Sequence, residues 1–127
     1  MHRSRLAGFI IDCKTEDLEQ AATFWSGALG YSLIDPAEES SSSYRRLATG
    51  PNDPHIEVQS VKHESRVHLD IETDDIEAEV RRLESLGAKR VQQVHTWWVM
   101  EAPTGQRFCV VRIQRPASFD PHANTWE

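Results

Sequence analysis

The stretch Ile11-Asp-Cys-Lys-Thr-Glu-Asp-Leu-Glu19 is followed 58 positions later by Leu69-Asp-Ile-Glu-Thr-Asp-Asp-Ile-Glu77. The Asp, Thr, Asp and Glu at the second, fifth, seventh and ninth places are the same in both stretches. Further matches follow in the same order: Leu29-Gly30 with Leu86-Gly87, and residues 51–59 with residues 103–111. An internal repeat of this kind indicates a duplicated structural unit. The sequence therefore predicts two copies of one unit, one after the other.

Each copy begins with the pattern of a half-buried strand followed by an amphipathic helix. Residues 9–13 and 67–71 show the period of two that is typical of a strand. Apolar residues then recur at helical spacing: Leu18, Ala21, Ala22, Trp25 and Leu29 in the first copy, and Ile76, Val80, Leu83 and Leu86 in the second. Thr15 and Thr73 are predicted as N-caps, with acidic residues in the first turn after them. Gly30 and Gly87 are predicted to end the helices, because glycine adopts the left-handed conformation most easily.

Three further strands are predicted in each copy. They span about 31–35, 44–49 and 55–61 in the first copy, and about 89–95, 96–102 and 107–113 in the second. Between the first two, Glu38 and Glu39 with Ser40-Ser-Ser-Ser43 have the composition of an exposed hairpin loop.

The predicted fold is α+β, with two tandem βαβββ modules that form a curved, mostly antiparallel mixed sheet carrying one helix per module. A single domain is expected over residues 1–127, with module one at about 8–61 and module two at about 65–113. The tail, residues 114–127, is polar. It either folds back over a groove or crosses to a partner subunit, and fraying is the default expectation.

Composition and charge limit the partners. The 127 residues carry 14 Lys and Arg against 20 Asp and Glu, a formal net charge of −6. Nucleic acid is not an expected partner, because binding phosphates needs clustered basic residues. No stretch reaches the roughly 20 apolar residues of a membrane span, and no signal-peptide core follows the basic start. We therefore expect a cytoplasmic protein without a membrane partner, in which Cys13 and Cys109 are reduced thiols.

Strand alternation separates an apolar face from a mostly polar face in both copies. The polar face is predicted to carry Ile10, Asp12, His55, Glu57, Gln59, His68, Asp70, Arg107 and Cys109. Convergent polar groups on a concave face are what a small-molecule site requires. A sheet face that is simply solvated shows the same alternation, so both interpretations stay open.

Three polar residues have a chemical and a structural interpretation each. His68 beside Glu57 has the groups of a general acid–base pair, or it is a structural histidine. Asp70 either faces a ligand or ties its strand to the following helix. Cys109 is either a nucleophile, which requires an activating base and partial exposure, or a packing residue.

Two further side chains are candidates for contacting a ligand. In Trp97-Trp98 one ring belongs to the core and the other is available to stack on a flat ligand, and Trp98 is assigned that role. Arg107 either pairs with an anionic group of a ligand or keeps a strand edge solvated.

Three segments resemble the vicinal oxygen chelate superfamily, and in particular its glyoxalase-like and bleomycin-resistance proteins. Residues 17–30 (DLEQAATFWSGALG) are similar to the family's first helix, Arg66-Val-His-Leu-Asp70 to its fifth strand, and residues 102–110 (APTGQRFCV) to the hairpin that enters its last strand. The superfamily also includes glyoxalase I, extradiol dioxygenases and methylmalonyl-CoA epimerase. The resemblance covers about residues 8–113.

The resemblance implies a cup formed by the two modules, with four residues around a divalent metal. The four positions fall on Ile10, Glu57 (or Gln59 if the register slips), His68 and Cys109. His68 and Glu57 match the chelating pattern. Ile10 has no ligand atom, and hard ions prefer oxygen to the sulfur of Cys109. The resemblance therefore predicts an incomplete metal site.

Three functions remain. The first is a protein that binds a small molecule in the cup through His68 and Glu57 together with Gln59, Asp70, Trp98, Arg107 and Cys109. The second is a divalent-metal-dependent lyase, isomerase or dioxygenase that uses His68 and Glu57. The third is a non-catalytic dimerisation module, and the resemblance implies a homodimer in any case.

Overall fold

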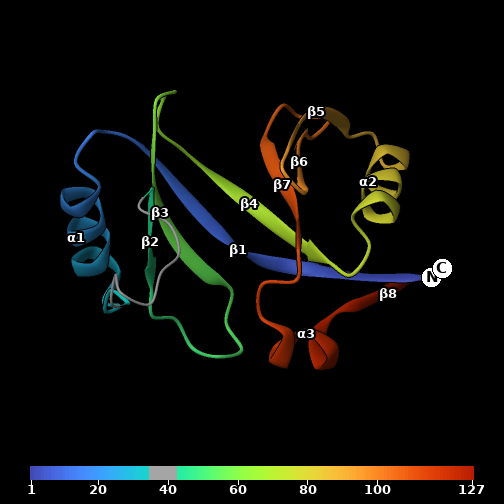
Figure 1. Cartoon of the computed structure of the whole chain (residues 1–127), viewed down its shortest axis with the longest axis horizontal. Coiled ribbons are helices and arrows are strands. Elements are labelled where there is room, and N and C mark those ends of the chain that lie inside the picture. The colour runs from blue at the N-terminus through green and yellow to red at the C-terminus, as the bar shows by residue number, and fades with distance from the viewer. Residues whose placement is uncertain (35–42) are drawn as a thin grey trace. The chain divides into compact units, whose positions relative to one another are not determined.

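The computed structural model describes residues 1–34 and 43–127 and confirms the predicted α+β class, with eight strands and three helices in these residues (Figure 1). The strands are β1 (His2–Lys14), β2 (Tyr44–Leu47), β3 (His55–Val61), β4 (Arg66–Thr73), β5 (Lys89–Val94), β6 (Trp97–Glu101), β7 (Arg107–Arg112) and β8 (Asn124–Trp126). The helices are α1 (Leu18–Leu29), α2 (Ile76–Ser85) and α3 (Pro116–His122). None of the described helices is both long and apolar enough to cross a membrane. The predicted hairpin loop lies outside the described residues, except for Ser43.

The chain divides into two compact units. The first unit is Gly8–Val67, and the second unit combines Met1–Ala7 with His68–Glu127. In the first unit the strand order is β2-β3-β1, with β3 parallel to β1 and antiparallel to β2, and α1 packs against β2 and β3. In the second unit the order is β4-β7-β6-β5, and only the β4–β7 pair of these four strands is parallel. Antiparallel pairing therefore predominates in the second unit, as predicted, whereas the first unit has one parallel and one antiparallel pair.

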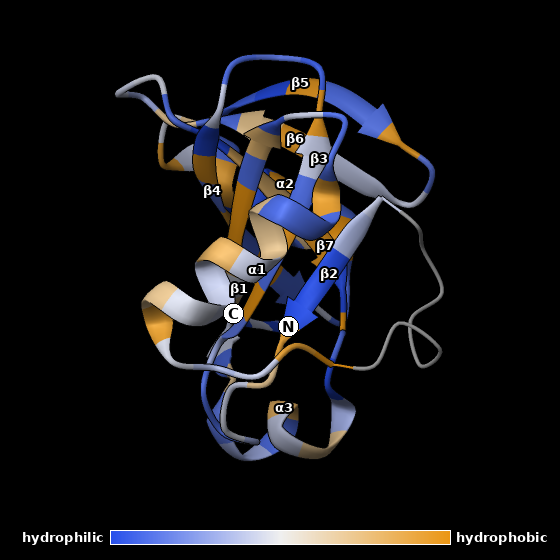
Figure 2. Cartoon of the chain, turned by 90° about the vertical axis from the view of Figure 1, so that its left-hand side faces the viewer, coloured by the Kyte–Doolittle hydropathy of each residue, from blue (hydrophilic) through white to orange (hydrophobic). Residues whose placement is uncertain are grey.

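The hydrophobic core of the second unit lies between α2 and the sheet. Val80 and Leu83 of α2 pack with Met100 of β6 and Val110 of β7. The outermost strands of the two units, β2 and β5, are coloured mainly hydrophilic in Figure 2. Polar side chains on an edge strand discourage unwanted pairing with another chain. Leu29 and Leu86, predicted as buried helix positions, are instead 44% and 65% exposed, because Leu29 is the last residue of α1 and Leu86 is the C-cap that follows α2.

The two helix starts correct one prediction. Asp17 and Asp75 are the N-caps, and their carboxylates accept hydrogen bonds from the backbone N–H groups of Gln20 (3.0 Å) and Ala78 (3.1 Å). The predicted caps, Thr15 and Thr73, lie two residues earlier, and their hydroxyls accept from the N–H of the capping Asp. A carboxylate near the positive end of the helix dipole is the stronger cap. As predicted, glycine follows the last turns, with Gly30 and Gly87 at positive φ.

Two other expectations are wrong. Residues 31–34 form no strand and make only an isolated bridge, Leu33 to Leu47. The tail does not fray: it forms α3 and then β8, which pairs antiparallel with the start of β1. Phe119 anchors α3, since its ring is 2% exposed and lies under the guanidinium groups of Arg3 and Arg5 at 5.7 and 5.6 Å.

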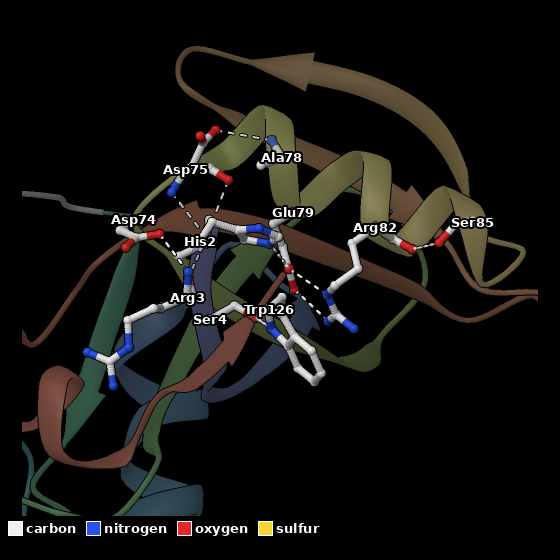
Figure 3. Close-up of polar contacts among 11 residues, drawn as sticks. His2, Arg3, Ser4, Asp74, Asp75, Ala78, Glu79, Arg82, Ser85 and Trp126 are labelled. Carbon is white, nitrogen blue, oxygen red and sulfur yellow. Dashed lines mark hydrogen bonds and ion pairs between the residues drawn. The ribbon is translucent and has the colours of Figure 1, made fainter.

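A buried carboxylate connects α2 to the beginning of the chain (Figure 3). Glu79 is 0% exposed. Arg82 donates two hydrogen bonds to its carboxylate at 2.8 Å each, and Nε2 of His2 lies 2.8 Å from Oε1. Arg82 also stacks over the ring of Trp126 in β8, 3.9 Å from its centroid. The first and last strands are thus held to α2 by one set of contacts.

We expect Glu79→Ala to lower the free energy of unfolding by about 3 kcal/mol, because removing one partner of a buried ion pair leaves the other charge uncompensated. Glu77→Ala on the same helix is the matched control. Glu77 pairs with Arg81 and Arg90 at the surface, where such pairs contribute at most about 1 kcal/mol. Urea denaturation measures both, and equal losses in the two variants would contradict the role given to Glu79.

The pH dependence of this contribution follows from the pKa of Glu79. Burial alone would raise the pKa, but hydrogen bonds from Arg82, His2 and Ser4 outweigh burial and lower it. A carboxyl group whose folded pKa is lowered stabilises the protein above its unfolded pKa, about 4.3, and loses that effect as the pH falls through the folded pKa. The stability difference between wild type and Glu79→Gln should therefore be largest near neutral pH and shrink in acid. A difference that stays constant down to about pH 3 would contradict this.

Candidate functional site

In the second unit, β4 and β7 present their polar side chains to the side away from α2. Phe108 and Val110 of β7 pack into the core with α2, and so does Ile71 of β4. Side chains alternate along a strand, so Cys109 points to the other side. Asp70 is the register partner of Cys109 in the parallel pairing, and His68 lies two residues before Asp70 on the same side.

Three side chains of different chemistry meet at this point. One ligand atom each from His68, Asp70 and Cys109 lie within 4.8 Å of one another. Nε2 of His68 is 3.4 Å from Oδ1 of Asp70. The side chains of His68 and Asp70 are 13% and 14% exposed, and Cys109 is a half-buried free thiol. We call these three residues the His–Asp–Cys cluster.

Asp70 is the unusual member. Its Oδ1 atom is buried and accepts no hydrogen bond from the residues that the structure describes. A buried acceptor without a donor costs about 1–3 kcal/mol. Asp70 does not tie β4 to α2, because Thr73 and Asp75 make those contacts. The cluster therefore has an acceptor that a bound donor or cation would satisfy.

The charged neighbours on the same face are already paired. Glu72, 0% exposed, binds Arg5 at 2.8 Å and accepts from the backbone N–H of Gln114 at 2.7 Å. Nε of Arg107 donates to Glu101 at 3.3 Å. Val99 of β6 is the register partner of Cys109 and adds an apolar side to the cluster.

The two tryptophans of β6 lie on opposite faces. Trp98 is the register partner of Val110 and packs against the core, with the guanidinium of Arg90 5.1 Å from its ring centroid. Trp97 alternates to the side of Val99 and Cys109. Trp98, the residue predicted to contact a ligand, is thus placed on the α2 side. Trp97 is on the polar side.

The remaining predicted residues, Glu57 and Gln59, belong to the first unit. Oε1 of Glu57 accepts a hydrogen bond from Nη2 of Arg46 at 2.7 Å, and Nε2 of His55 is 3.8 Å from the same oxygen. Gln59 is two residues further along β3 on the same face, opposite Asp12 of β1. Ile10, opposite Glu57, is 2% exposed.

Known proteins resemble this chain in sequence family and in fold. The family model of the glyoxalase-like domain matches residues 8–111. No curated protein matches the sequence. Solved structures share the fold at low sequence identity. The chain belongs to the glyoxalase-like domain family.

Three solved structures illustrate the shared fold. An NAD-dependent benzaldehyde dehydrogenase from Legionella pneumophila has a TM-score of 0.60 at 11% identity, covering 83% of this chain and 99% of that chain. The Mn(II)-bound glyoxalase from Novosphingobium aromaticivorans has a TM-score of 0.57 at 17% identity, covering 87% of this chain but 39% of that chain. Methylmalonyl-CoA epimerase from Mycobacterium tuberculosis has a TM-score of 0.52 at 16% identity, covering 89% of this chain and 91% of that chain.

The four-residue metal set implied by the family does not fit this chain. Ile10 has no ligand atom and is buried. Glu57 is engaged by Arg46. His68 and Cys109 remain, and Asp70 of the same unit offers a third ligand atom within 4.8 Å of theirs. All three residues were expected on the polar face among other candidates, but not as a separate set, because nothing in the sequence specifies the β4–β7 register. The sequence also left Trp97 without a role.

The placement of the tryptophans predicts different effects of truncation. We expect Trp98→Ala to lower the free energy of unfolding by about 3 kcal/mol, because it opens a cavity against the core. Trp97→Ala, the matched control, should cost less than about 1 kcal/mol. Chemical denaturation of the two variants tests the assignment, and the reverse order would mean that the faces are exchanged.

Proposed function

We propose that this protein binds a small molecule over the polar face of β4 and β7, with the His–Asp–Cys cluster as the centre of the site. The observation that carries the proposal is the convergence of His68, Asp70 and Cys109 within 4.8 Å on one side of the sheet. A few convergent polar groups beside apolar ones are typical of small-molecule sites. Val99 and Trp97 supply apolar surface on the same side.

The free hydrogen-bonding capacity of the cluster indicates the class of ligand. Asp70 has a buried oxygen that needs a donor, so a hydroxyl or amine group on the ligand suits it. Arg107 is bound to Glu101 and is therefore not the obvious partner for an anionic group. We propose a neutral or cationic molecule that carries at least one hydroxyl or amine.

The second candidate, an enzyme that uses His68 and Glu57 with a divalent metal, has less support. It requires the Glu57 carboxylate as a ligand or base, and Arg46 already binds that carboxylate at 2.7 Å. The cluster itself retains an imidazole beside a carboxylate, which is the pairing used for proton transfer. Small-molecule binding is the preferred function, because it does not require Arg46 to release the Glu57 carboxylate.

A thermal-shift screen of small hydroxyl- and amine-bearing metabolites and antibiotics tests the proposal. We expect compounds that raise the midpoint of wild type and shift the amide resonances of β4 and β7. Asp70→Ala should weaken their binding at least about tenfold, since a buried charged group loses its hydrogen bond to the ligand.

His63→Ala is the matched control for His68→Ala, because His63 is an exposed histidine of the first unit. It should bind hits as tightly as wild type, and His68→Ala should not. The proposal fails if no compound raises the midpoint, or if hits bind the Asp70 and His68 variants unchanged. A stable dimer together with no hits would instead favour a dimerisation module.

A further inference from the structure

We infer that His68, Asp70 and Cys109 form a binding site for one borderline transition-metal ion of the Zn²⁺ or Co²⁺ type, held by the second unit alone. This ligand set differs from the one implied by the family. It uses neither Ile10 nor Glu57, and it adds Asp70. The inference goes beyond the proposed function, because the ion would bind without any small molecule.

The distances suit ligands of one ion better than they suit a hydrogen bond. Zinc binds His nitrogen at about 2.0–2.1 Å, carboxylate oxygen at about 2.0–2.2 Å and Cys sulfur at about 2.3 Å in tetrahedral geometry. Two such ligand atoms are then about 3.3–3.6 Å apart. Nε2 of His68 and Oδ1 of Asp70 are 3.4 Å apart, and the three ligand atoms all lie within 4.8 Å.

The backbone supports this arrangement. Asp70 and Cys109 are register partners on adjacent strands, which are about 4.8 Å apart. His68 is on the same face of β4, one side-chain repeat away. Ligands carried by paired strands are held more precisely than ligands on loops, so small rotamer changes are sufficient to bring the three atoms onto one ion.

Charge and hydrogen bonding point to a cation at this place. Oδ1 of Asp70 is buried and has no hydrogen-bond donor among the described residues. The nearby charged side chains, Glu72 and Arg107, are paired with Arg5 and Glu101. A thiolate and a carboxylate together would neutralise a divalent ion. Among the described residues, the basic side chain paired with the Asp70 carboxylate is His68, at 3.4 Å, which is itself one of the three ligands.

The donor types select the ion. A thiolate disfavours Mg²⁺, Ca²⁺ and Mn²⁺, which prefer oxygen, and imidazole with thiolate suits zinc and its neighbours in the transition series. Three protein ligands with a fourth position for water or another molecule is the pattern of catalytic zinc sites.

Titration of metal-free wild type with Co²⁺ tests the inference without any small molecule. We expect one ion per chain, with visible bands of tetrahedral cobalt and a near-ultraviolet charge-transfer band from a thiolate ligand. Zn²⁺ should displace the cobalt and abolish both signals, and Mg²⁺ should not. A folded protein that shows no thiolate charge-transfer band would overturn the inference.

Variants identify the ligands. Cys109→Ser is nearly isosteric and should remove the charge-transfer band. His68→Gln and Asp70→Asn should weaken Co²⁺ binding by at least about tenfold, because even loss of a residue that only orients a ligand costs about 10–100-fold. Circular dichroism establishes that each variant is folded, and Cys109→Ser alone decides the question if the other two do not fold.

The matched controls are Cys13→Ser and His63→Ala, both in the first unit. Burial raises the pKa of the Cys13 thiol, a hydrogen bond with Trp25 opposes this, and Asp12 adds to it. Both controls should retain the cobalt spectrum of wild type. A band that persists in Cys109→Ser, or that disappears in Cys13→Ser, would assign the thiolate elsewhere and overturn the inference.

Discussion

The parallel pairing of β4 with β7 is the constraint on which the candidate site depends. It places Asp70 opposite Cys109 on one face while Ile71, Phe108 and Val110 enter the core with α2 on the other. A slip of one residue would exchange the two faces and bring a carboxylate into the core. The packing that stabilises the second unit therefore also decides which polar side chains meet.

The ends of the chain belong to the same structure. Glu72 and Glu79 are both fully buried, and their carboxylates are bound by side chains of the first strand, Arg5 and His2. The segment after β7 adds the backbone N–H of Gln114, and β8 completes the pairing with β1. The polar residues near both termini are ordered in the structure because they bind these buried carboxylates, which require partners.

Family membership and chemistry diverge in this protein. The fold is shared with proteins that bear very different names at 11–17% identity, and a fold of this kind supports many functions. Of the four metal positions implied by the family, one is a buried isoleucine and one is a cysteine. The cluster that does form includes Asp70, which the family pattern does not assign to the metal. The proposals made for the cluster therefore rest on its donor set rather than on the family.

The sequence alone determined the α+β class, the two main helices and the division of strand residues between an apolar and a polar face. These features depend on hydrophobic periodicity and on local signals such as glycine after a helix. Such signals involve only a few neighbouring residues. Only the tertiary structure decided that Asp17 and Asp75 cap the helices, that the tail forms α3 and β8, and that Trp97 rather than Trp98 lies on the polar side. It also decided that His68, Asp70 and Cys109 meet. The register of β4 against β7 pairs residues about 40 positions apart. It is set by the packing of the core, and no local sequence pattern specifies that packing.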